Sequence, residues 1–127
     1  MTVSEAIARA DAILPGVALS DPTAIDPRWQ AIIAVAEHVQ SEPLAVWEFA
    51  SRWGANEDED LRDAIATCVL EHLLEHHFAL IFPLVVRRAA EAPLMVDTVR
   101  RCWKLGAAGE VENADQLMRF LGGDEAL

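Results

Sequence analysis

The chain has 127 residues, the length of a single domain, and 53% of them are hydrophobic, with only six Gly and six Pro. This composition predicts a folded globule and excludes a disordered chain. Lys and Arg number 10 against 21 Asp and Glu, which gives a formal net charge of −11. Such a charge argues against direct binding of nucleic acid, because that affinity comes mainly from cations that neutralise phosphates.

Targeting and membrane signals are also missing from the sequence. No apolar run approaches the roughly 20 residues of a bilayer-spanning helix, and residues 1–5 lack the basic and apolar regions of a signal peptide. The two cysteines, Cys68 and Cys102, do not form the disulfide framework of a small secreted domain and are interpreted as buried free thiols. We therefore predict a cytoplasmic protein that does not contact a membrane.

Helix start and stop residues organise the first half of the chain. A helix is predicted over residues 3–14, followed by a polar loop from Pro15 to Thr23. Asp26-Pro27 then supplies an N-cap and a first-turn proline, with apolar residues at helical spacing behind it. Pro43 starts the next helix, and Gly54 is predicted to end it in the left-handed conformation.

The second half follows the same pattern. Asn56 is predicted to cap a long helix that opens with the acidic run Glu57–Asp60, which suits the positive end of the helix dipole. His77-Phe78 is predicted to break that helix. Further helices are expected over residues 79–90, from Ala92-Pro93 to near Gly106, and over 113–121. No segment alternates with the period of a strand, so the fold class is all-α.

An internal repeat indicates which all-α fold to expect. A shift of 34 residues places Asp26-Pro-Arg28 on Asp60-Leu-Arg62, and nine residues further on a Glu-His pair recurs. This spacing equals one helical hairpin. A weaker echo at a shift of 50 residues places residues 43–53 on 93–103. The two registers compete, so the repeat boundaries stay open.

Residues 56–73 resemble the second helix of a HEAT repeat. Such repeats carry an acidic turn, then an apolar residue followed by Arg, then small residues and a Leu, as in Leu61-Arg62, Ala64, Ala66 and Leu70. The resemblance implies one domain over residues 1–127 that forms a short right-handed α-α superhelix of six or seven helices. The expected hairpins cover residues 3–40, 43–76 and 78–105, and a capping helix covers 113–121.

The resemblance also implies structural roles. In HEAT-like stacks the matching Arg bridges to an acidic turn residue of a neighbouring repeat, so Arg28 and Arg62 are expected to pair with Asp26, Asp58 or Asp60. The helical periodicity predicts a core. Its members are Ile32, Val35, Val39, Leu61, Ile65, Val69 and Leu73.

The sequence His72-Leu-Leu-Glu75-His76 spells the H-x-x-E-H signature of inverted zinc metallopeptidases. A regular helix of about 100° per residue, however, places both histidines on the inward face and Glu75 on the polar stripe. His38 occupies the same place one repeat earlier, so His38, His72 and His76 are the only candidate metal ligands. We predict two inward, hydrogen-bonded histidines, no metal or other cofactor, and no catalytic residue.

Acidic residues are predicted to form one strip along the long helix. It opens at Glu57, Asp58, Glu59 and Asp60 and continues through Asp63, Glu71 and Glu75, with Glu37 extending it. A strip of like charge speeds the encounter with a cationic partner, whereas specific binding also needs an apolar anchor. Trp47 and Trp53 are the expected anchors.

These features favour a binding module that grips another protein, as an adaptor or as an immunity-like inhibitor. Its partner is expected to be a basic protein, and the oligomeric state is left open. The alternatives are a metal-dependent hydrolase that uses His72, Glu75 and His76, and a HEAT-like DNA-repair protein, which the net charge disfavours. Half of the basic residues fall in a small group that serves either as ordinary helix-end cations or as a basic patch. They are Arg87, Arg88, Arg100, Arg101 and Lys104.

Overall fold

The computed structural model describes residues 1–15 and 26–122, and the described residues form helices and turns without any strand. The all-α prediction is therefore confirmed. The predicted loop from Pro15 to Thr23 lies, beyond Pro15, outside the described residues. The elements are α1 (Val3–Ile13), α2 (Pro27–Ala36), α3 (Pro43–Trp53), α4 (Glu59–Ile65), η1 (Ala66–Leu70), α5 (Glu71–Glu91), α6 (Leu94–Arg100), η2 (Gly106–Gly109) and α7 (Val111–Phe120).

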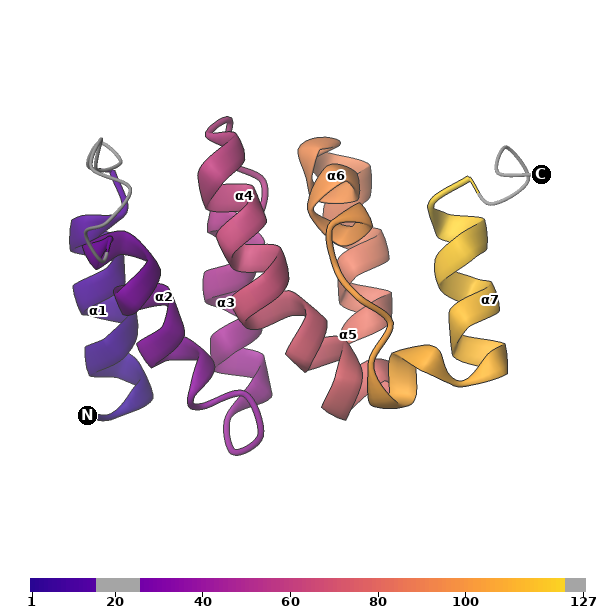
Figure 1. Cartoon of the computed structure of the whole chain (residues 1–127), viewed down its shortest axis with the longest axis horizontal. Helices are drawn as coiled ribbons and strands as arrows, with labels where there is room; N and C mark the ends of the chain where they lie inside the picture. The colour runs from indigo at the N-terminus through magenta and orange to yellow at the C-terminus, as the bar shows by residue number, and fades with distance from the viewer. Residues whose placement is uncertain (16–25, 123–127) are drawn as a thin grey trace.

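The helices stand side by side in chain order along the long axis of the molecule, and their pairs build two layers (Figure 1). Helices α1, α3 and α5 contact one another in one layer, and α2, α4 and α6 do so in the other. The turn between α2 and α3 and a kink at His77 coincide with the limits of the expected hairpins. The right-handed superhelix stays a prediction.

Local capping chemistry explains where the helices begin. Thr2 and Glu5 form a reciprocal capping box at α1, and Asp26 accepts a hydrogen bond from the Arg28 backbone N–H at α2. At α4 the cap is Asp58 rather than the predicted Asn56. The Asn56 side chain instead accepts from the Asp58 N–H, so it shapes the turn that precedes the helix.

Gly54 follows α3 for a reason other than the predicted left-handed conformation. Its φ is −70° and its ψ is −10°, which any residue can adopt. A Cβ atom at this position would lie 2.6 Å from the Ala50 carbonyl oxygen and 3.1 Å from the Met95 methyl. The close approach of the Ala50 carbonyl of α3, with the Met95 side chain of α6 beside it, therefore favours glycine here, and the prediction of a left-handed residue was wrong.

One continuous helical run, residues 59–91, forms the centre of the molecule. It contains α4, a π-helical turn at Ala66–Leu70 and α5. At His77 the backbone leaves the helical region with φ −137° and ψ 40°, which confirms the predicted break and turns the second part of α5 back beside α3. With residues 59–91 counted as one helix, the described residues form six helices, within the predicted six or seven.

The predicted core residues are buried without exception. Val39 is the most exposed of them, at 3%. They come from both layers, and the aromatic rings of Phe49, Phe78 and Phe82 complete the same cluster. Periodicity alone therefore identified the inward positions of α2 and α4.

The central run also has the length and composition of a membrane-crossing helix. Half of its most apolar window is buried against other parts of the molecule, and core helices of soluble proteins pass the same test. The expectation that the chain does not contact a membrane stays a prediction.

Candidate functional site

The acidic turn before α4 is tied to α2 through a buried arginine. The Arg28 side chain is 3% exposed and donates through Nη1 to Asp58 Oδ2 at 3.1 Å and through Nη2 to Asp60 Oδ2 at 2.8 Å. The indole N–H of Trp29 adds a bond of 3.1 Å to the same Asp60 oxygen. Asp26, the third expected partner, lies 3.8 Å from Arg28 Nε, so Arg28 pairs with all three acidic residues that the sequence suggested.

Arg62, one repeat later, makes the corresponding connection to α6. Its Nε donates to Asp97 Oδ2 at 3.0 Å, and its Nη1 donates to the backbone carbonyls of Asn56 and Glu57, both at 2.9 Å. The partner is therefore Asp97 rather than one of the acidic turn residues that the sequence suggested. Arg101 donates to the same Asp97 oxygen and reaches Glu59 at 2.8 Å.

These contacts hold two carboxylates in the ionised form. Burial by itself would raise the pKa of Asp58, but hydrogen bonds from Arg28 and from the Asp60 N–H outweigh it and lower that pKa below its ordinary value. At Asp97, burial by itself would likewise raise the pKa. The hydrogen bonds from Arg101 and Arg62 outweigh this effect, so the pKa of Asp97 is also lowered. The acidic run therefore serves as a set of ion-pair links between neighbouring helices.

The lowered pKa of Asp58 predicts a pH-dependent stability. Its contribution is fully present above the ordinary aspartate pKa of about 3.9 and is lost as the pH falls through the lower folded-state value. Asp58→Asn keeps a good N-cap residue but removes the charge. We expect this variant to be less stable than the wild type at pH 7 and to approach it at about pH 2–3, as measured by urea unfolding. A stability difference that is constant with pH would contradict the ion-pair role.

The structure does not assemble the predicted acidic strip. Asp58, Asp60 and Glu59 are paired with arginines, and Asp63 lies 3.7 Å from Arg101. Within the described part of the chain only Glu57 of the opening run is exposed and without an ion-pair partner. Glu71 is buried at 7% exposure, so its expected place on the strip was wrong.

The two tryptophans expected as anchors are engaged within the fold. Trp47 is 7% exposed and belongs to the core cluster. Trp53 is half-buried, and its indole N–H donates to Asp11 Oδ1 at 2.7 Å. Both join α3 to its neighbours, so the surface that they leave for a partner is small.

The π-helical turn accounts for the three residues beyond residue 70 that the helical projection misplaced, Glu71, His72 and His76. A π-turn closes its hydrogen bond one residue later than an α-turn, so the residues after it are rotated by about 100° relative to a regular helix. Glu71, expected outside, therefore points inward. His72 and His76, expected inside, have side chains that are 40% and 36% exposed.

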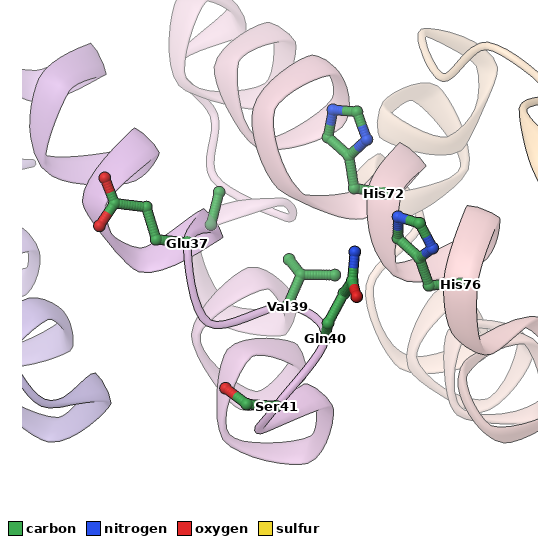
Figure 2. Close-up of a pocket in the computed structure, with 7 residues that line it drawn as sticks. Glu37, Val39, Gln40, Ser41, His72 and His76 are labelled. Carbon is green, nitrogen blue, oxygen red and sulfur yellow. The ribbon is translucent and has the colours of Figure 1, made fainter.

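This rotation places both histidines beside a hollow of about 370 Å³ between the α2–α3 turn and α5. Figure 2 shows the two imidazoles on one side of it, with Gln40 facing them from the turn. Glu37 and Ser41 complete the polar lining, and Ala36 and Val39 supply apolar atoms. This hollow, which we call the histidine pocket, lies at the opposite edge of the molecule from the acidic turn before α4 (Figure 1).

A carboxylate connects the two imidazoles of the histidine pocket. Glu75 Oε1 lies 2.9 Å from His72 Nδ1 and 3.4 Å from His76 Nε2. The hydrogen bond from His72 lowers the pKa of Glu75, which keeps this carboxylate charged. Glu37 is exposed, and within the described residues no cation contacts it. The lining of the pocket therefore holds one carboxylate, Glu37, and Glu75 contacts the lining imidazoles without being part of the lining.

The same geometry bears on the hydrolase alternative. Among residues 1–15 and 26–122, no three His, Cys, Asp or Glu side chains are placed to hold a metal ion. His38, the expected third histidine, does not line the pocket. The H-x-x-E-H motif thus lies on the surface as two partly exposed histidines joined by Glu75.

Sequence reasoning did not find this pocket as a site. Gln40 and Ser41 lie in a turn without a recognisable motif, and Glu37 was seen only as an extension of the acidic strip. The Glu-His pairs that recur 34 residues apart, Glu37-His38 and Glu71-His72, were the one available signal, because they place polar residues at the same edge of successive helices.

Comparison with known proteins adds no assignment. The chain matches no protein-family model, no curated protein and no solved structure. Fold and pocket together define a class only, an all-α stack of helix pairs with a polar hollow at one edge. Function must therefore be argued from this chain's own residues.

Proposed function

We propose that this chain is a protein-interaction module, a short HEAT-like stack that binds a cationic segment of a partner protein in the histidine pocket. The observation that carries the proposal is the Glu37 carboxylate in the lining of this hollow, which has no ion-pair partner within the described residues, together with Glu75, which contacts the two imidazoles of the lining. The module acts as an adaptor or as an immunity-like inhibitor of a basic protein.

The lining of the pocket suits a guanidinium or ammonium group. Glu37 supplies negative charge, and Gln40 and Ser41 add neutral oxygen acceptors. Glu75, bonded to the imidazoles of the lining, adds a second negative charge nearby. The flat imidazoles of His72 and His76 offer faces on which a guanidinium can stack. The volume of about 370 Å³ is at the small end of the range for ligand sites, which fits one or two side chains rather than a folded domain.

The net charge of −11 favours the approach of a cationic partner rather than its contacts in the pocket. A strongly acidic surface raises the local concentration of a cationic partner, and this attraction weakens as salt shortens the Debye length of about 8–10 Å. The paired acids of the α3–α4 turn contribute little to that attraction, because arginines already neutralise them.

The test uses a peptide of six arginines as the probe. The variant Glu37→Gln/Glu75→Gln removes the charge of the lining and that of the carboxylate bonded to its imidazoles. Glu48→Gln/Glu110→Gln removes two exposed charges elsewhere that have no ion-pair partner within the described residues. At low salt we expect the pocket variant to bind the peptide about tenfold more weakly, equivalent to about 1.4 kcal/mol, as measured by calorimetry. The control should stay close to the wild type.

Two results would contradict the proposal. An equal loss of affinity in both double variants would show that net charge alone attracts the peptide. Wild-type binding that is unchanged in the pocket variant would place the cation site elsewhere. Circular dichroism of each variant verifies that the helices are intact.

A further inference from the structure

Trp103 is the most exposed aromatic residue that the structure describes. Its exposed fraction is 72%, whereas the other three tryptophans and all four phenylalanines are buried or half-buried. It lies after α6, in the segment that leads along α5 towards η2 (Figure 1). A large aromatic surface left in water is typical of a binding anchor, because tryptophan is enriched among the residues that dominate interface energies.

The backbone that carries Trp103 is held in place by buried groups. Its N–H donates to Glu71 Oε1 at 3.0 Å, and Glu71 is only 7% exposed. The neighbouring Cys102 thiol donates to the Ala66 carbonyl at 3.5 Å. A buried carboxylate is unfavourable unless it is hydrogen-bonded. Because the Glu71 carboxylate accepts from the Trp103 N–H, this bond fixes the position of the segment. Trp103 is therefore presented to solvent by an anchored backbone.

The surroundings of Trp103 are cationic, in contrast to the chain as a whole. A hollow of about 410 Å³ is lined by the five consecutive residues Arg100 to Lys104. Arg101 is committed to Glu59 and Asp97. Arg100 donates only to the Leu121 carbonyl, and Lys104 lies 3.1 Å from the Met118 sulfur. Within the described residues neither of these two cations forms an ion pair.

We propose that Trp103, Arg100 and Lys104 form a second docking site, which binds an acidic segment of a protein. Carboxylates of that segment pair with Arg100 and Lys104, while an apolar or aromatic side chain covers the Trp103 indole. This partner has the opposite charge to the one proposed for the histidine pocket, so the inference goes beyond the proposed function and does not depend on it.

Charge complementarity selects a short acidic protein segment over nucleic acid. A phosphate backbone would also be attracted to Arg100 and Lys104, but it would extend over a surface with a net charge of −11, where it is repelled. A short peptide needs only the local cations and the indole. Base stacking on Trp103 is the competing possibility, and the experiment includes it.

The probe is a synthetic peptide, Glu-Glu-Leu-Phe-Glu-Glu, added to the full chain at low salt and followed by the indole N–H signals in NMR spectra. The four tryptophans give four such signals, and Trp103→Ala identifies one of them by its loss. We expect the peptide to shift the Trp103 signal and to leave those of Trp29 and Trp53, which donate to Asp60 and Asp11, in place.

Matched variants separate the site from general charge effects. Trp103→Ala should weaken peptide binding at least tenfold, whereas Val111→Ala, which alters a residue 78% exposed, should not. Arg100→Gln/Lys104→Gln should weaken binding severalfold, whereas Arg9→Gln/Arg87→Gln, with the same change of charge, should have little effect. Because all of these side chains are exposed, the variants should keep their helical spectra.

Three outcomes would overturn the inference. The acidic peptide would fail to shift the Trp103 signal, or it would bind Trp103→Ala as tightly as the wild type. Alternatively, a six-residue oligothymidylate would bind more tightly than the peptide, which would make the surface a site for single-stranded nucleic acid.

Discussion

Replacing Val69 with Asp is expected to unfold the protein. Val69 is completely buried in the π-helical turn at the centre of the fold, where α4, α5 and α2 meet. An unpaired carboxylate at such a position destabilises the folded state by several kcal/mol, which is comparable to the roughly 5–15 kcal/mol that stabilises a domain of this size. The far-ultraviolet circular dichroism spectrum should lose its helical minima.

The matched control for Val69→Asp is Leu80→Asp. Leu80 lies on α5 with 44% of its surface exposed, so an Asp at this position stays hydrated. We expect this variant to keep a cooperative thermal transition close to that of the wild type. A soluble and fully helical Val69→Asp protein would show that the central run does not pack as described.

Replacing Arg62 with Ala is expected to cause the next largest loss of stability. Arg62 is 9% exposed and joins α6 to the turn before α4 through Asp97 and the carbonyls of Asn56 and Glu57. Its removal takes this donor away from the carbonyls of Asn56 and Glu57, and an unsatisfied buried group costs about 1–3 kcal/mol. Because Asp97 keeps its bond from Arg101, we expect a total loss near the lower half of that range.

Urea unfolding at pH 7 measures the effect of Arg62→Ala, with Arg87→Ala as the control. Arg87 is exposed and, within the described residues, forms no ion pair. Arg62→Lys should recover only part of the stability, because one ammonium group cannot reproduce the fork that reaches three acceptors. An unchanged unfolding midpoint for Arg62→Ala would show that the contacts of Arg62 do not stabilise the fold.

Local patterns in the sequence were sufficient for the helices, most of their limits and the core. Asp26-Pro27 starts α2, His77 breaks the long helix, and the apolar positions of α2 and α4 are buried as predicted. These features depend on a few neighbouring residues, and a linear chain displays such information directly. The 34-residue repeat related Arg28 to Arg62, and the resemblance to HEAT repeats implied that both link neighbouring helices.

The side chains with which these residues pair could not be predicted from the local sequence. Nothing local to Arg62 distinguishes Asp97 from Asp58, and nothing local to Trp53 reveals Asp11 on α1. The acidic run looked like a free surface because sequence shows which charges are present but not which arginines approach them. Its conversion into ion-pair links required three helices to be placed side by side.

The positions of the residues at the histidine pocket depend on a single turn that only the tertiary structure shows. The π-turn at Ala66–Leu70 adds one residue to the helical repeat and rotates everything after it by about 100°, which brings Glu71 inward and sends His72 and His76 outward. Glu71 then anchors Trp103, and the histidines face the α2–α3 turn. Sequence alone specified that this segment is helical, whereas its phase was set by packing against α2, α3 and α6, because the free energy of burying one face exceeds the small local preference for a regular helix.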